Sequence, residues 1–238
     1  LKSVIALFRH GDRTPSEREY KILIGHENYT DLINVGYAAL TNEGKNRMYN
    51  VGRFMRNRYR HFLTNNPQEI YIKSARLDRC LVSAELVAAG MYPPFDQFMA
   101  VACPGDEEKI EMLVQHDKYS LKSCNVILNY FKGKNVTNLT CSKLYYISSA
   151  FHKIEHAGYQ LPNMIDEEMF DYLKKYQLQS DFFVAATMRL LGIYNDLRVP
   201  YGATLIFELY SNANSSYVKT YYYNETNTNN TFELRPKI

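Results

Sequence analysis

The sequence predicts an α/β protein in which helices flank a central sheet of parallel type. Residues 4–8 form a short, uncharged apolar run, which is typical of a strand buried on both faces. Two segments with apolar residues at helical spacing follow, and residues 69–74, which lie between them, predict a second strand. Because strand and helix alternate, we expect right-handed crossovers and parallel pairing.

The two helices have clear start and stop signals. Thr41 can cap the first helix, and Pro67 closes that segment. Between them, apolar and aromatic residues recur at helical spacing, namely Met48, Val51, Phe54, Met55, Tyr59 and Phe62. Residues 78–91 predict the second helix, which Pro93 and Pro94 stop.

The last part of the chain regains sheet character. Residues 184–194 predict a helix, and residues 204–210 and 217–223 predict two strands joined by a polar turn, hence a hairpin. The middle of the chain is mostly helical in pattern. We therefore divide the chain into an α/β core of residues 1–106 and 180–238 and a helical lid of residues 107–179.

Composition narrows the classes of function. The 238 residues carry a net charge of +3, and the basic residues are scattered, so no nucleic-acid partner is expected. No apolar run reaches membrane-spanning length, so no membrane span is expected. The start at Leu1 fits a terminus left by signal-peptide removal. Six glycosylation sequons favour a secreted glycoprotein; they begin at Asn28, Asn135, Asn138, Asn214, Asn224 and Asn229.

The cysteines and histidines leave alternatives open. Four cysteines permit two disulfides in three connectivities, yet Cys80 also fits a buried free thiol on a helix. His152 and His156 have the spacing of two metal ligands on a helix, but no third ligand is evident. We therefore expect no metal and no cofactor, and the sequence predicts no oligomeric state.

Residues 9–15, Arg-His-Gly-Asp-Arg-Thr-Pro, leave the first predicted strand as a loop, where α/β sheets bind ligands. A neutral imidazole at His10 can attack phosphorus. The guanidinium groups of Arg9 and Arg13 can each bind phosphate oxygens through two N–H groups. Gly11 lets the backbone approach a ligand. This residue set indicates a phosphate site with its own nucleophile.

This heptapeptide after an apolar strand resembles the motif of the histidine acid phosphatase family. Residues 40–44, 89–94 and 191–201, and then 208–210, are similar to further segments of that family. The resemblance is greatest to the secreted insect acid phosphatase-like proteins of venom and saliva. It implies the histidine phosphatase fold, with His10 accepting the phosphate and Arg9 and Arg13 holding it.

One departure from the family pattern follows the second predicted strand. The family carries an Arg-Ser pair there, and the resemblance makes that Arg a third phosphate clamp. This chain has Lys73-Ser74, and lysine keeps the charge but loses the planar fork. Arg79 follows closely, but its place at a helix start gives no reason to make it the substitute.

The larger departure is at residue 180. The family carries a His-Asp pair there, in which the Asp protonates the leaving group and the His binds phosphate. Ser180-Asp181 aligns with this pair, so the carboxylate is kept and the imidazole is lost. Phe182 and Phe183 follow, where small polar residues are usual. Asp181 equally fits a helix cap.

Three functions remain open. The leading hypothesis is a secreted, catalytically impaired protein that binds small mediators, either biogenic amines or leukotriene-like lipids, in the former active site. Asp181 would pair with an ammonium group, and Phe182 and Phe183 would stack on a ring. The alternative is an active acid phosphatase that hydrolyses phosphate monoesters through a phosphohistidine at His10. The third is a secreted protein that acts through its surface.

Overall fold

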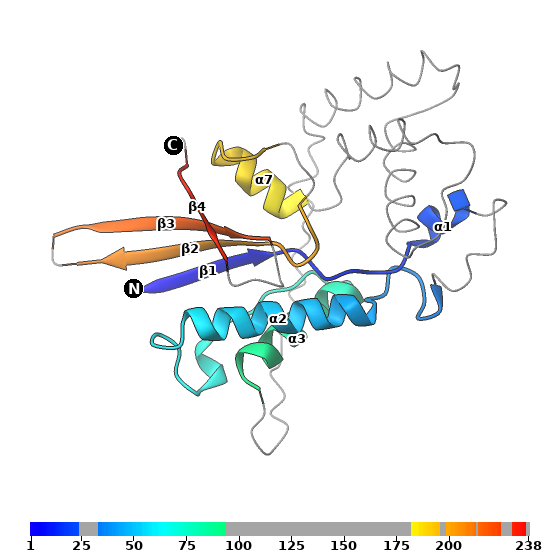
Figure 1. Cartoon of the computed structure of the whole chain (residues 1–238), viewed down its shortest axis with the longest axis horizontal. Coiled ribbons are helices and arrows are strands. Elements are labelled where there is room, and N and C mark those ends of the chain that lie inside the picture. Colours follow the sequence, from blue (N-terminus) through cyan, green and yellow to red (C-terminus); the bar gives the residue numbers. More distant parts are fainter. Residues whose placement is uncertain (24–32, 94–181, 196–198, 213, 225–229, 237–238) are drawn as a thin grey trace, which may run out of the picture.

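The computed structural model describes residues 1–23, 33–93, 182–195, 199–212, 214–224 and 230–236. Its elements are β1 (Ser3–Phe8), α1 (Glu17–Leu23), α2 (Asn42–Arg58), the 3₁₀ helix η2 (Pro67–Glu69), α3 (Asp78–Met91), α7 (Phe182–Leu190), β2 (Thr204–Ser211), β3 (Ser216–Tyr223) and β4 (Phe232–Leu234). Helices α2 and α3 lie on one face of the sheet and α7 lies on the other, which gives three layers (Figure 1). The predicted arrangement of helices that flank a sheet is confirmed.

The sheet has the order β1-β2-β3-β4, and each neighbouring pair is antiparallel. The predicted hairpin is confirmed, because β2 and β3 pair along their full length. The predicted parallel pairing is wrong for these four strands. Strand β1 lies beside β2, with Ser3 opposite Leu209. A pairing between residues so far apart in the chain cannot be inferred from the local alternation of strands and helices.

The strand predicted at residues 69–74 is also wrong. Residues 67–69 form a 3₁₀ helix, in which the Asn66 side chain accepts a hydrogen bond from the Gln68 N–H. Residues 70–73 belong to no strand. Tyr71 is 69% exposed, whereas Ile70 packs against the core beside α2 and α3, so burial alternates along this run without a strand being formed at residues 70–73. Alternating burial alone therefore does not make a strand.

Both predicted helices of the first half are present, although α2 ends at Arg58, before the predicted helical position Phe62. Helix α2 begins after Thr41, whose hydroxyl oxygen accepts a hydrogen bond from the Gly44 N–H at 3.0 Å. Helix α3 spans the predicted residues 78–91. The two helices cross closely, because a Cβ atom on Gly52 would lie 2.1 Å from the Val87 carbonyl oxygen.

Helix α7 ends earlier than the predicted residue 194. Its last turn closes with the Ile193 N–H donating to the Met188 carbonyl and the Gly192 N–H donating to the Arg189 carbonyl. Gly192 has a φ of 66°, as a helix end of this kind requires.

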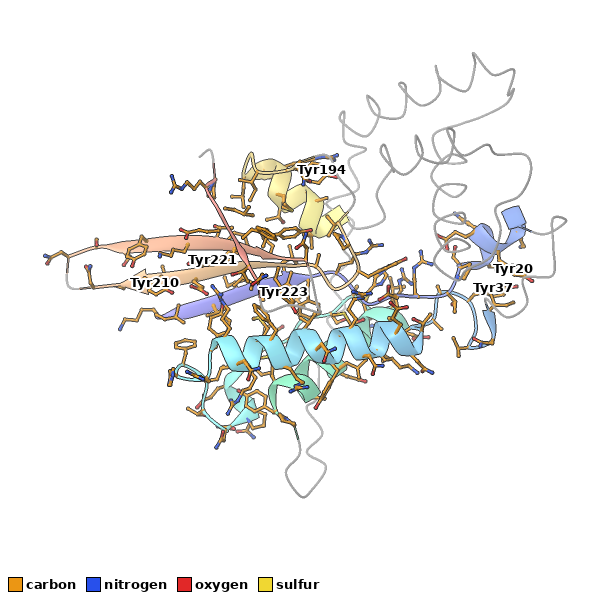
Figure 2. All side chains as sticks on the ribbon, viewed as in Figure 1. Tyr20, Tyr37, Tyr194, Tyr210, Tyr221 and Tyr223 are labelled. Carbon is orange, nitrogen blue, oxygen red and sulfur yellow. The ribbon has the colours of Figure 1, made fainter. Side chains whose placement is uncertain are left out.

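The alternation of side chains along the strands builds two cores. Ile206 and Tyr223 point to α2 and α3, whereas Leu205 points to α7. Tyr223 stacks on Phe54 of α2, with ring centroids 3.9 Å apart, and Figure 2 shows it between the sheet and α2. Tyr194 lies on the opposite side with α7 (Figure 2). The sheet is therefore buried on both faces around residue 206.

The predicted lid, residues 107–179, lies outside the described residues, as do Cys124, Cys141 and the pair His152 and His156. Cys80 is a free thiol, which excludes the arrangement with two disulfides. No helix in the described ranges is long and apolar enough to cross a membrane.

Candidate functional site

The motif of residues 9–14 follows β1 directly and is buried throughout. The segment at residues 199–203 holds its first half, because the Arg9 N–H donates to the Ala203 carbonyl and the Gly202 N–H donates to the His10 carbonyl. The second half is held at Leu40, which forms a bridge with Arg13. The loop is therefore fixed by segments from both ends of the chain, independently of any ligand.

The N-terminal turns of α2 and α3 both abut this loop. The Gly11 N–H donates to Ser83 Oγ of α3 at 3.2 Å. A Cβ atom on Gly11 would lie 2.4 Å from the Gly44 carbonyl oxygen of α2. The sequence predicted that Gly11 lets the backbone approach a ligand, which stays a prediction; in the structure, Gly11 lets the backbone of α2 approach the loop.

His10 is buried, and its Nδ1–H donates to the Gly11 carbonyl oxygen at 2.8 Å. A carbonyl only accepts, so the neutral ring keeps its lone pair on Nε2. Burial, together with the smaller effects of the Arg9, Arg13 and Arg79 charges, lowers the pKa of His10 to about 2, although the hydrogen bond to Gly11 acts in the opposite direction. The ring is thus neutral at any physiological pH, which is the form that a nucleophile requires.

Arg9 is fixed by two groups from the 199–203 segment. Its Nη1 donates to the Val199 carbonyl at 2.5 Å. Its guanidinium carbon lies 4.0 Å from the centre of the Tyr201 ring. The same ring lies 5.6 Å from the ring of His10. Tyr201 thus contacts both the candidate nucleophile and a candidate clamp.

Arg13 forms an ion pair with Glu19 of α1. Nη1 lies 2.8 Å from Glu19 Oε2, and Nη2 donates to Oε1 at 3.2 Å. Nη1 also donates to the Thr14 carbonyl oxygen. Asp12 is held in the same way by Arg47 of α2, whose Nε lies 2.5 Å from Oδ2. The Asp12 carboxylate is therefore engaged by Arg47.

Arg79 is a site residue that the sequence reasoning set aside. It lies in the first turn of α3, where its carbonyl accepts a hydrogen bond from Ser83 Oγ at 2.6 Å. The charges of Arg79 and Arg13 both act on His10 and on Cys80, so the two guanidinium groups share one region. The Nε of Arg79 is buried and has no hydrogen-bond partner among the described residues.

Lys73, the predicted third clamp, is exposed. Ser180 and Asp181 lie outside the described residues. Phe182 and Phe183 begin α7, and the structure does not describe their side chains. The structure thus brings together Arg9, His10 and Arg13, and adds Arg79, Glu19 and Tyr201. The signal that could have indicated Arg79 is its position four residues, about one helical turn, before Ser83, the first buried residue of α3.

Within the described ranges, no three His, Cys, Asp or Glu side chains gather as a metal site. What gathers instead is cationic: three guanidinium groups around one neutral imidazole. Such a set can bind an anion with several oxygens and present a nitrogen lone pair to it.

One family model and several known proteins are similar to this chain. The sequence model of the family described as "Histidine phosphatase superfamily (branch 2)" matches residues 1–181. Venom acid phosphatase Acph-1 of Apis mellifera is 38% identical over 96 residues, which are 40% of this chain and 25% of that protein. Human lysosomal acid phosphatase has the same identity over 96 residues, which are 22% of its length. The chain thus matches about a quarter of these relatives' length.

A longer match joins the chain to human prostatic acid phosphatase, which is 24% identical over 305 aligned positions, covering 95% of this chain and 78% of that protein. Among solved structures, the phytase of Klebsiella sp. ASR1 superposes with a TM-score of 0.61 at 14% identity, over 93% of this chain and 81% of the phytase. The phytase of Citrobacter braakii gives 0.59 at 14% identity, over 93% and 85%. These superpositions show the fold.

Proposed function

Because this chain belongs to branch 2 of the histidine phosphatase superfamily, we propose that its motif binds the phosphate group of a phosphate monoester and that His10 accepts it. The observation that carries the proposal is the state of His10. Its Nδ1–H is engaged by the Gly11 carbonyl, and burial and three arginines keep the ring neutral. The lone pair needed for attack is therefore on Nε2.

In the proposed reaction, an Nε2–P bond forms as the P–O bond of the ester breaks. The departing oxygen takes a proton from an acid, for which the sequence alignment suggests Asp181. Water then attacks phosphorus and gives a proton back to the same acid, the Nε2–P bond breaks, and inorganic phosphate leaves while Nε2 regains its lone pair. Arg9, Arg13 and Arg79 would stabilise the charge on the equatorial oxygens in both steps.

We also propose that turnover is reduced. The resemblance implied two lost groups, a clamp at residue 73 and an imidazole at residue 180. Arg79 offers the third cation near His10, so the clamp is supplied and the loss is confined to Ser180. The absence of one stabilising donor costs about 10²–10³ in rate. A slow acid phosphatase is therefore favoured over a protein without any activity.

Binding of a mediator remains a second proposal, and the charges of the site favour one of its two classes. Three guanidinium groups near His10 suit the carboxylate of a leukotriene-like lipid. A biogenic amine would instead need a carboxylate that is not already engaged. Among the described carboxylates of the motif region, Asp12 is paired with Arg47 and Glu19 with Arg13, so Asp181 is our candidate partner for an amine.

We propose an extracellular or secretory-pathway location. Six sequons in 238 residues support it, and the relatives include a venom and a lysosomal acid phosphatase.

The test is hydrolysis of an aryl phosphate near pH 5 by the purified protein, beside calorimetric titration with sulfate. We expect slow turnover that the His10→Ala variant lacks, and sulfate binding that Arg9→Ala loses. Trapping a phosphorylated histidine in wild type would support the mechanism. Undiminished turnover in His10→Ala would refute the mechanism, and so would sulfate binding that is unchanged in Arg9→Ala.

A further inference from the structure

We propose that Glu19 sets the charge of the phosphate site, by holding Arg13, so that the site suits one doubly charged oxyanion. This inference rests on the proposed phosphate binding and adds a residue that determines which anion charge the site prefers. Glu19 acts through Arg13, so it is a positioning residue and takes no part in bond making.

The contact between Glu19 and Arg13 is fully buried. Their side chains are 1% and 6% exposed, respectively. Both carboxylate oxygens lie on the outer edge of the guanidinium, with Oε2 opposite Nη1 and Oε1 opposite Nη2. An Arg–carboxylate pair of this geometry fixes the plane of the guanidinium. These hydrogen bonds use Nη1 and Nη2, whereas the Nε–H of a guanidinium points along a different edge.

The position of Glu19 is fixed independently of Arg13. Its Oε2 accepts a hydrogen bond from the Ser16 N–H at 2.5 Å, and its own N–H donates to Ser16 Oγ at 3.3 Å. This reciprocal pair is a capping box at the start of α1. The helix is held further by Tyr20, whose ring lies 5.6 Å from Tyr37, and Figure 2 shows the two tyrosines beside α1. The carboxylate is thus placed by local structure, and Arg13 follows it.

The net charge around His10 follows from these pairs. Arg9, Arg13 and Arg79 act on His10 as three cations. Asp12 and Arg47 neutralise each other as a pair. Glu19 offsets the charge of Arg13, so the four described groups Arg9, Arg13, Arg79 and Glu19 sum to two positive charges beside the neutral His10. One phosphomonoester dianion would balance that sum.

An anion bound to Arg13 would share this guanidinium with the Glu19 carboxylate, and the two negative groups would repel each other. Removing the charge of Glu19 while keeping its shape should therefore strengthen anion binding. Glu19→Gln does this, because glutamine also completes a capping box and keeps one carbonyl oxygen for Arg13.

The experiment is calorimetric titration of the whole chain with sulfate, which stays doubly charged between pH 4 and 8, at low ionic strength. We expect Glu19→Gln to bind sulfate about tenfold more tightly than wild type. Glu19→Asp keeps the charge and should stay within about twofold of wild type. Glu17→Gln is the matched control, because Glu17 is 60% exposed on the same helix and pairs with Lys21. It should also stay within about twofold.

Each outcome either supports or overturns the role of Glu19. Equal or weaker binding by Glu19→Gln, at an unchanged melting temperature, overturns the charge role and leaves the phosphate site standing. Tighter binding by Glu19→Asp also overturns it, and this variant decides alone where the glutamine variant fails to fold. Binding by Glu19→Gln but not by wild type supports the inference. If neither protein binds sulfate, the phosphate site is wrong and the inference falls with it.

Discussion

Tyr201 covers Arg9, with the guanidinium carbon 4.0 Å from the centre of the ring, and the same ring lies 5.6 Å from that of His10. A residue from a distant segment therefore orients a clamp and borders the candidate nucleophile. A cation over a buried aromatic face contributes about 0.5–2 kcal/mol.

Replacing Tyr201 should therefore loosen Arg9. We expect Tyr201→Leu to weaken sulfate binding by about 3- to 30-fold, as measured by calorimetry. Tyr217→Leu serves as the control, because Tyr217 is 48% exposed and stacks on Tyr210 of the hairpin. Equal affinities in wild type and Tyr201→Leu would show that Arg9 needs no ring to hold it.

His10 should resist protonation in the free protein. Its pKa is lowered to about 2, so its imidazole signals should not titrate between pH 7 and 4 in nuclear magnetic resonance spectra. Bound sulfate offsets the charges of Arg9, Arg13 and Arg79 and should raise this pKa. By linkage, sulfate then binds more tightly as the pH falls. His10→Ala identifies the signal, and a titration near pH 6.5 without sulfate would contradict the prediction.

The pH dependence of the free energy of unfolding should also come in part from His10. The unfolded chain takes up a proton at His10 near pH 6.5, whereas the folded protein takes it up only near pH 2. More protons bound to the unfolded state means that stability falls as the pH falls below 6.5. In urea unfolding between pH 6 and 4, the free energy of unfolding should fall more steeply in wild type than in His10→Gln. The difference should be up to about 1.4 kcal/mol per pH unit. Parallel stability curves would refute this.

Arg79 and Lys73 compete for the role of third clamp. Arg79→Ala should weaken sulfate binding by about 10- to 100-fold, since a hydrogen bond to a charged group contributes about 1.5–3 kcal/mol. Lys73→Ala should change it by less than about twofold, because Lys73 is exposed. Calorimetry on the two variants decides, and a larger loss in Lys73→Ala would restore the assignment from the sequence.

The pair of Asp12 and Arg47 ties the motif to α2. Their side chains are 10% and 21% exposed, so Asp12→Asn leaves a half-buried Arg47 with a weaker partner. We expect it to lower the free energy of unfolding by about 2–4 kcal/mol in urea. Glu43→Gln removes the other, 57% exposed partner of Arg47 and should cost about 0.5 kcal/mol or less. Similar costs for the two variants would contradict this.

Local patterns predicted the helices and the hairpin well. Residues 78–91 carry a helical period with proline stops, and α3 has those bounds. Strands β2 and β3 alternate around a short polar turn, and both are present. The run at residues 69–74 has the same β-forming composition but an exposed Tyr71, and no local pattern distinguishes it. The prediction of parallel pairing was wrong for a related reason, because β1 pairs with residues about two hundred positions later in the chain.

The site was predictable only where its residues are contiguous. Arg9, His10 and Arg13 were identified from one loop. Arg79 was set aside because a helix start explained it equally well. Glu19 had a visible signal, since Ser16 and Glu19 have the spacing of a capping box, but its ion pair with Arg13 depends on the loop's path. Tyr201 had no local signal, because its role comes from tertiary packing.

The pairing of β1 with β2 has a consequence for synthesis on the ribosome. Ser3 meets Leu209, and His10 meets Gly202, so the first strand has no described sheet partner until the last fifth of the chain emerges. At about 5–20 residues per second, that wait is on the order of 10–40 s. For this period the nascent chain must keep β1 without its partner β2, so the half of the His10 loop that the 199–203 segment holds is completed late.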